Sequence, residues 1–161
     1  VHELNAAGIT AVGLNGFDGT LLESTYLDKE TYGFVGEVMN VNTALLDALT
    51  AAGIVPVIAC IGATKEGQAL NINGDTVASE IALAVKAESL LLVTDVAGIR
   101  INDEYQKEVT EADINDWIEE GHIYGGMIPK VQGAVACLHA GIPSVQIVND
   151  TLTGTTIKTE G

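Results

Sequence analysis

Three short stretches of the chain combine glycine with side chains that can hold a ligand. In the first, "LNINGDTVASEIA", Asn71, Asn73 and Asp75 stand directly before an expected helix. Spacing alone favours a structural interpretation, in which Asp75 caps the helix and the asparagines shape a turn. A second interpretation makes the same residues a binding site, and the neighbouring Gly74 would allow close backbone approach.

The second stretch is "LLLVTDVAGI", residues 90–99. An apolar run ends on Thr94 and Asp95, and Gly98 allows a sharp turn three residues later. These side chains either form an ordinary polar turn after a strand or line the rim of a site for a nucleotide base or ribose.

The third stretch, "YGGMIPKVQGAVACLHAG", places Lys130 in the first turn of an expected helix, directly after Pro129. Proline suits this turn, but a cation is disfavoured at the positive end of the helix dipole. A lysine there is either solvated or shares an anion, most simply a phosphate, with the helix N–H groups.

Other familiar sites are missing from the sequence. It contains neither G-x-x-x-x-G-K-[ST] nor G-x-G-x-x-G, and its three histidines are scattered. Cys60 and Cys137 sit in apolar runs far apart, as expected for small buried side chains in a reducing compartment; a disulfide is the minor alternative.

The charge balance excludes some partners. The formal net charge is −15, from 22 acidic and 7 basic residues, so the surface repels nucleic acid and anionic lipid. A nucleotide is still possible, because a helix N-terminus and one lysine can bind phosphate locally. No apolar segment is long enough to span a membrane and no signal-peptide pattern opens the chain, which favours a cytoplasmic location.

The elements that must position the three stretches alternate between strand and helix. Apolar runs of strand length predict central parallel strands covered by helices on both sides, at residues 54–60, 89–94 and 144–148. A short apolar run at residues 9–14 predicts a further strand. Two more extended segments, 20–28 and 32–41, predict a β excursion. Helix patterns with suitable caps cover residues 42–53, 75–87, 111–120 and 128–140.

Smaller elements complete the expected fold. A hairpin is expected around "INDE" within residues 97–109, and a final edge strand at "GTTI". The pattern predicts an α/β protein, a three-layer αβα sandwich with a mainly parallel central sheet. Ligands in such sheets bind at the carboxyl ends of strands, where all three stretches are expected.

Taken together, N-x-N-x-D, T-D-V-x-G-I and G-G-M-I-P-K, in this order, resemble the amino acid kinase family. "YGFVGEV" favours its acetylglutamate kinase branch over the aspartokinase, carbamate kinase and uridylate kinase branches. The resemblance covers about residues 5–157. It implies transfer of the γ-phosphoryl group of ATP, with Mg²⁺, to the γ-carboxylate of N-acetyl-L-glutamate in arginine biosynthesis.

The resemblance also implies a role for each motif residue. Asp75 would orient the catalytic lysines and Lys130 would stabilise the moving phosphoryl group. Asn71 and Asn73 would bind the acetylglutamate. The nucleotide would be bound by Lys130 and by seven further residues: Thr94, Asp95, Val96, Gly98, Gly125, Gly126 and Met127. No dedicated metal ligand is expected, because Mg²⁺ at such sites keeps several waters.

One departure from the family pattern shapes the remaining expectations. The N-terminal strand with lysine and glycine, and the arginine-bearing substrate segment, have no counterpart. We expect residues 1–161 to be the nucleotide-binding C-terminal domain, with residues 1–40 at the junction to a missing N-terminal part, and to be inactive alone. The partner would be that part or a second copy. Alternatives are a non-catalytic nucleotide-binding or sensing module, a structural half that pairs with a separately encoded half, or another amino acid kinase.

Overall fold

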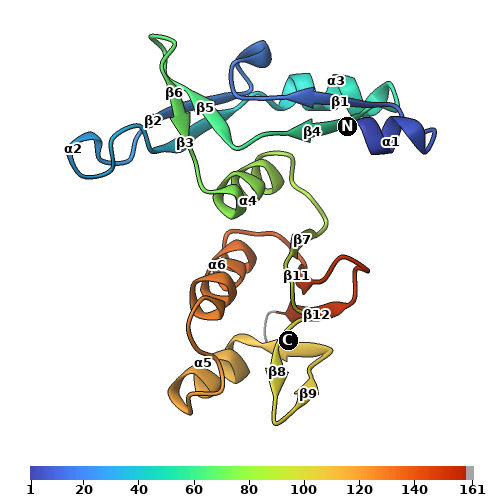
Figure 1. Ribbon diagram of the computed structural model, residues 1–161, viewed down its shortest axis with the longest axis vertical. Helices are drawn as coiled ribbons and strands as arrows, with labels where there is room; N and C mark the ends of the chain where they lie inside the picture. The colour runs from blue at the N-terminus through green and yellow to red at the C-terminus, as the bar shows by residue number, and fades with distance from the viewer. Residues whose placement is uncertain (159–161) are drawn as a thin grey trace. The chain divides into compact units, whose positions relative to one another are not determined.

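The computed structural model describes residues 1–158 and divides into two compact units, Val1–Ala84 and Val85–Gly161. Figure 1 labels their helices and strands. Each unit is described by itself. Within residues 1–158, no helix is long and apolar enough to cross a membrane.

Unit 1 contains two sheets and four α-helices among its described elements. Strands β1 and β4 form a parallel pair, and a four-stranded sheet has the order β3-β2-β5-β6. The elements in chain order are α1 His2–Ala6, β1 Ala11–Leu14, the 3-10 helix η1 Asp18–Thr20, β2 Leu22–Tyr26, α2 Lys29–Tyr32, β3 Gly36–Val41, α3 Thr43–Ala51, β4 Val55–Ile58, β5 Ile61–Ala63, β6 Ala69–Asn71 and α4 Gly74–Ala84.

Local sequence explains the ends of α3, and its apolar face contributes to the core. The Asn42 side chain accepts a hydrogen bond from the Leu45 N–H as the expected cap, and Gly53, with φ +72°, follows the last turn. The core of unit 1 consists of five buried apolar side chains, from β2, α3, α4 and the loops beside them: Leu21, Leu22, Leu46, Ile72 and Val77. The β1–β4 sheet contributes Leu14 and Ile58, which are partly buried and pack against this cluster.

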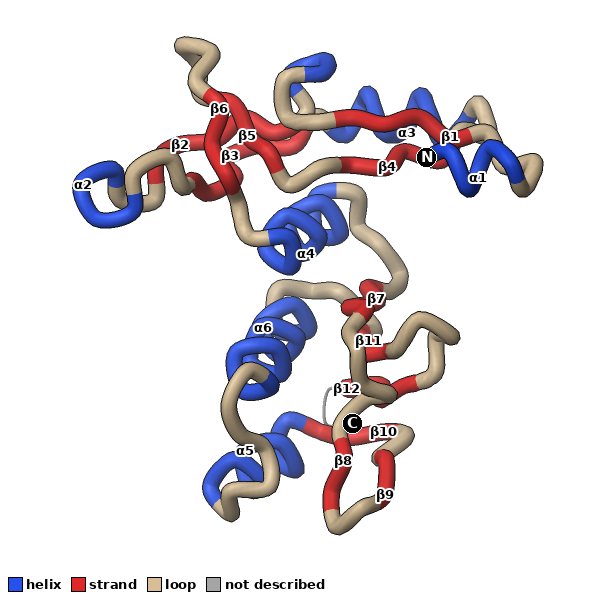
Figure 2. Tube along the Cα trace, in the orientation of Figure 1, coloured by secondary structure: helices blue, strands red, loops and turns tan. Residues whose placement is uncertain are grey.

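Unit 2 is built on one four-stranded sheet with the order β10-β12-β11-β7, in which β7 and β11 run parallel. A two-stranded hairpin, β8–β9, projects from it, as Figure 2 shows. The elements are β7 Leu90–Val93, β8 Arg100–Ile101, β9 Glu104–Tyr105, β10 Glu108–Thr110, α5 Glu111–Glu119, α6 Met127–His139, β11 Val145–Val148 and β12 Gly154–Lys158.

The α/β class with parallel strand pairing is confirmed, and most elements lie where the sequence places them. The N-terminus of α5 illustrates why: Thr110 and Asp113 form a capping box across the first turn. Helix α4 is shorter than expected and ends at Ala84, because Lys86 takes the left-handed conformation with φ +52°. Neither cysteine forms a disulfide among the described residues; Cys137 is buried and Cys60 is half-buried.

The strand at "GTTI" exists, but the expectation that it lies at the edge of the sheet is wrong. Strand β12 lies inside the sheet, parallel to β10 on one side and antiparallel to β11 on the other. The short strand β10 takes the edge instead. Its three residues begin shortly after β9, and the sequence carries no signal that marks them as a strand distinct from the β8–β9 hairpin.

Burial differs among the expected central strands. Strand β11 is almost fully buried, but alternate side chains of β4 and β7 are exposed. Val57 and Val93, for example, are 36% and 57% exposed. An apolar run of four residues therefore does not by itself indicate whether one face or both faces of the strand will be buried.

Candidate functional site

The first stretch is held in unit 1 by backbone hydrogen bonds at the end of β6. Asn71 donates its N–H to the Phe34 carbonyl at 2.9 Å, and the buried Ile72 donates to the Cys60 carbonyl at 3.0 Å. These two bonds fix the chain that leads into α4. The side chain of Asn71 is exposed beside that helix start.

The cap of α4 is Asn73, so the structural interpretation of Asp75 as the cap is wrong by two residues. The Asn73 Oδ1 accepts from the Thr76 N–H at 3.0 Å, and the Asn73 carbonyl accepts from Val77 at 3.0 Å. Asp75 is the second residue of the helix, where an acid suits the helix dipole. The helix begins one residue earlier than expected because Gly74 adopts a helical conformation.

A cavity of about 680 Å³ opens beside this stretch in unit 1. Apolar side chains of β4 and α4 line most of it, and Asn71 contributes an amide at its wall. The half-buried thiol of Cys60 also borders the cavity. An apolar hollow with one amide suits a small ligand that has both apolar and polar parts.

The second stretch leaves strand β7 in unit 2. Thr94 continues the strand pairing, because its N–H donates to the Val148 carbonyl at 2.8 Å. Its hydroxyl donates to the Asp95 carboxylate at 3.1 Å. The hydroxyl and carboxylate therefore stand together at the carboxyl end of β7, where an α/β sheet binds ligands.

Gly98 is required by the turn that follows. Its φ is +102°, and a Cβ at this position would overlap the Thr155 hydroxyl. Thr155 is fully buried; its Oγ1 accepts from the Ile99 N–H at 2.8 Å and donates to the Gln106 carbonyl at 2.6 Å. Sequence reasoning missed Thr155, although its place two residues before Ile157, on the same face of the strand, was the available signal.

The third stretch forms the start of α6. Gly125, with φ +59°, makes the turn that leads into the helix, and Gly126 occupies the cap position without a side-chain bond. The Met127 N–H donates to the Tyr124 carbonyl and the Ile128 N–H donates to the Gly125 carbonyl, each through a long bond of 3.3 Å. Lys130 is the fourth residue of this helix, so it lies in the first turn as the sequence predicts. Its side chain is partly exposed.

A second cavity, of about 290 Å³, lies within unit 2 and brings parts of these two stretches together. Val96 and Gly98 line it from the turn after β7, and Met127 lines it from the first turn of α6. These three residues were all expected to contact a nucleotide. Thr94, Asp95, Gly125, Gly126 and Lys130 lie on the same two segments.

Four further polar or aromatic residues border this cavity, and sequence reasoning did not identify them as site residues. They are Arg100, Tyr105, His122 and Tyr124. Arg100 is the only arginine of the chain, and that rarity was a usable signal. The two tyrosines gave none, because an isolated tyrosine in a polar loop is ordinary.

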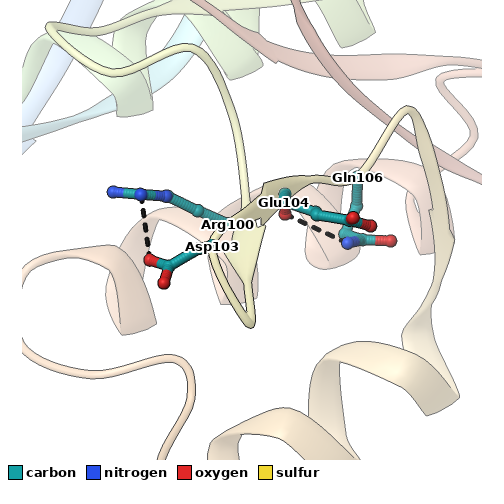
Figure 3. Close-up of polar contacts among 4 residues, drawn as sticks. All are labelled: Arg100, Asp103, Glu104 and Gln106. Atoms are coloured by element: carbon teal, nitrogen blue, oxygen red, sulfur yellow. Dashed lines mark hydrogen bonds and ion pairs between the residues drawn. The ribbon is translucent and has the colours of Figure 1, made fainter.

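The β8–β9 hairpin holds Arg100 in place (Figure 3). Asn102 and Asp103 both have positive φ, which is the turn type that joins two strands through two residues. This tight turn brings the Asp103 Oδ1 to 2.9 Å from the Arg100 Nη2. The guanidinium carbon lies 5.9 Å from the centre of the Tyr105 ring, and Gln106 donates to the Glu104 carbonyl at 3.1 Å.

The three expected acceptor-side residues, Asn71, Asn73 and Asp75, belong to unit 1, whereas the expected nucleotide residues belong to unit 2. Within residues 1–158, no group of three or more His, Cys, Asp or Glu side chains is placed to hold a metal ion.

Comparison with known proteins identifies the class of the chain. Residues 1–149 match the model of the amino acid kinase family, so the chain belongs to that family.

Among individual relatives, an acetylglutamate kinase of Halalkalibacterium halodurans is 44% identical, over 98% of this chain and 64% of that protein. One of Bacillus pumilus is also 44% identical, over 98% of this chain and 62% of the relative. The crystal structure of smu.665 from Streptococcus mutans UA159 covers 98% of this chain and 64% of its own, with 34% identity and a TM-score of 0.86. The chain thus spans slightly less than two thirds of the length of these relatives.

Proposed function

We propose that this chain is part of an acetylglutamate kinase, an enzyme that phosphorylates the γ-carboxylate of N-acetyl-L-glutamate with ATP. The observation that carries the proposal is the order and placement of the three motifs, each beside a strand end or helix start, together with 44% identity to two acetylglutamate kinases.

The nucleotide part of the proposal rests on unit 2. Its cavity is bordered by Val96, Gly98 and Met127, which suit the faces and edges of an adenosine. Thr94 and Asp95 would face the ribose or base from the end of β7. Lys130 would hold the phosphates, since a lysine in the first turn of a helix adds its charge to that of the helix dipole.

The acceptor part of the proposal rests on unit 1. Asn71 would bind the α-carboxylate of N-acetyl-L-glutamate. Because the Asn73 Oδ1 caps α4, its Nδ2 is the group that it would offer to a carboxylate. Asp75 would orient lysines rather than act as a base, because an ionised acceptor carboxylate has no proton to lose.

Mg²⁺ would enter this site with ATP, neutralising phosphate charge when bound. Magnesium commonly keeps several waters and needs only one or two carboxylates besides the phosphates. Within residues 1–158, no group of three or more His, Cys, Asp or Glu side chains could form a dedicated cage, and Asp95 offers a single carboxylate beside the proposed nucleotide site of unit 2. This donor set fits a metal carried mainly by the nucleotide.

We further propose that the 161 residues alone turn over slowly. Phosphoryl transfer to a carboxylate brings two anions together and needs several cations at the reacting atoms. Across the three motif stretches, Lys130 is the only lysine. The same scarcity favours the second candidate, a nucleotide-binding module without catalysis of its own.

Calorimetric titration of the whole chain with ADP and Mg²⁺ tests the nucleotide role. We expect ADP to bind, and Lys130→Ala to weaken that binding at least tenfold, as for a lost charged hydrogen bond of about 1.5–3 kcal/mol. Lys107→Ala, which removes an exposed cation outside the cavity lining, is the matched control.

Unchanged ADP affinity in the Lys130→Ala variant, or equal losses in both variants, would contradict the phosphate role. The slow-turnover proposal has its own readout. Acetylglutamate-dependent phosphorylation by the unmodified chain at roughly 1–100 per second, the range of ordinary kinases, would overturn it.

A further inference from the structure

The cavity of unit 2 carries one feature that the motif residues do not explain, which is an arginine with an acidic and an aromatic neighbour. Arg100 lines the cavity, its Nη2 is 2.9 Å from Asp103, and its guanidinium lies over the Tyr105 ring. Tyr124 and His122 border the same space. The wall is therefore both aromatic and cationic, a combination that binds planar ring systems.

The ion pair decides which part of a nucleotide this wall can meet. Asp103 offsets part of the guanidinium charge, so a phosphate is attracted less to this pair than to a cation with no acidic neighbour. The part that fits here is uncharged, which is the base. Phosphates have a better position at the N-terminus of α6, where Lys130 lies.

The chemistry of the lining then limits how the base is recognised. A guanidinium has donors and no acceptor, so it can only contact an acceptor atom on the edge of a base. No side-chain amide or carboxylate lines the cavity as the described residues form it. Purines carry an acceptor at N7, which arginine contacts readily, whereas the corresponding edge of cytosine carries only the N4 donor.

We propose that Arg100 is a specificity-determining residue of the nucleotide site and that it donates a hydrogen bond to N7 of a purine base. Asp103 and Tyr105 position its guanidinium for this contact. Guanine nucleotides fit the same donor, because O6 beside N7 is also an acceptor. The inference rests on the proposed nucleotide site in unit 2 and adds the class of base that the site selects.

The test compares ADP with 7-deaza-ADP, in which a C–H replaces N7, by calorimetry on the whole chain. For the unmodified chain, we expect 7-deaza-ADP to bind about tenfold more weakly than ADP, the loss for a hydrogen bond to a charged donor. In Arg100→Met, which keeps the apolar length, the two ligands should bind equally. Lys107→Met should keep the tenfold difference, since Lys107 lies outside the cavity lining.

Two other nucleotides and one further variant extend the test. CDP should bind at least tenfold more weakly than ADP, and GDP should bind within about tenfold of ADP. Asp103→Asn, which keeps a residue that tolerates positive φ, should reduce the difference between ADP and 7-deaza-ADP without abolishing binding.

The experiment distinguishes a failure of the proposed Arg100 contact from a failure of the proposed nucleotide site. If ADP binds and 7-deaza-ADP binds equally well, the contact between Arg100 and N7 is wrong while the nucleotide site stands. The same holds if Arg100→Met weakens both ligands by one factor, because Arg100 would then contact the phosphates. If ADP does not bind at all, the nucleotide site itself is wrong and the inference falls with it.

Discussion

The two cavities beside the motif stretches differ in both size and chemistry. The cavity of unit 1 is about 680 Å³, and apart from Asn71 its walls are mainly apolar. The cavity of unit 2 is about 290 Å³ and is bordered by an arginine, a histidine and two tyrosines. Of these two cavities, the one in unit 2 therefore offers more groups for directional recognition, whereas the one in unit 1 offers volume and one amide.

The ways in which the two regions are held also differ. The unit 2 turn at Gly98 depends on a contact with Thr155, more than fifty residues away in sequence. The α4 start in unit 1 depends on a cap made within three residues, between Asn73 and Thr76. Damage to the long-range contact should therefore be more severe than damage to the local cap.

The largest effect is expected from Gly98→Ala. The added methyl group would overlap the Thr155 hydroxyl, and alanine is strained at φ +102°. We expect a loss of about 2–4 kcal/mol in the free energy of unfolding, measured by urea denaturation, together with loss of ADP binding.

A matched substitution is available in the same unit. Gly133 lies inside α6 with nothing within 4 Å of an added Cβ, so Gly133→Ala should stabilise by about 0.5–1 kcal/mol. If both variants behaved alike, the long-range contact would not be what holds unit 2.

A smaller effect is expected from Asn73→Ala in unit 1. Removing the cap of α4 should cost about 1 kcal/mol, because the Thr76 N–H loses its side-chain acceptor. Amide hydrogen exchange at Thr76 should speed up in this variant. Asn73→Asp keeps an oxygen at the cap and should preserve the protection. Unchanged exchange in Asn73→Ala would show that the helix start is held by other contacts.

The smallest effect concerns a second local cap in unit 1, at Asp28. The Thr31 hydroxyl and N–H hold the pKa of this carboxyl below its usual range. A lowered pKa in the folded state means that the cap stabilises α2 above the unfolded pKa and is lost as pH falls through the lower folded value. An NMR titration of Asp28 should show a lowered midpoint, and Thr31→Val should return it toward about 3.9. A midpoint that did not move would contradict this assignment.

How far the sequence could predict the fold depended on the range of the contacts. Asn42, Gly53 and the Thr110–Asp113 pair act within one helical turn, so the ends of α3 and the start of α5 could be read from neighbouring residues. The position of β12 between β10 and β11 could not, because it depends on pairing with strands that the local pattern does not specify.

The candidate site shows the same limit. Val96, Gly98 and Met127 were recognisable from motifs, and the structure places all three around one cavity. Tyr105 and Tyr124 come to that cavity through the hairpin and the turn before α6, neither of which carries a distinctive pattern. Asn73 was recognised as polar, but its role as the cap depends on where α4 begins.

The bonds of Thr155 also have a consequence for synthesis. The turn at Gly98 and the segment at Gln106 are both held by this hydroxyl, which lies in the last described strand. A ribosome makes both segments well before it makes Thr155, so the cavity beside them cannot take its final form until β12 has emerged. During that interval the nascent chain would expose Ile99 and Val109, which are buried in the finished unit.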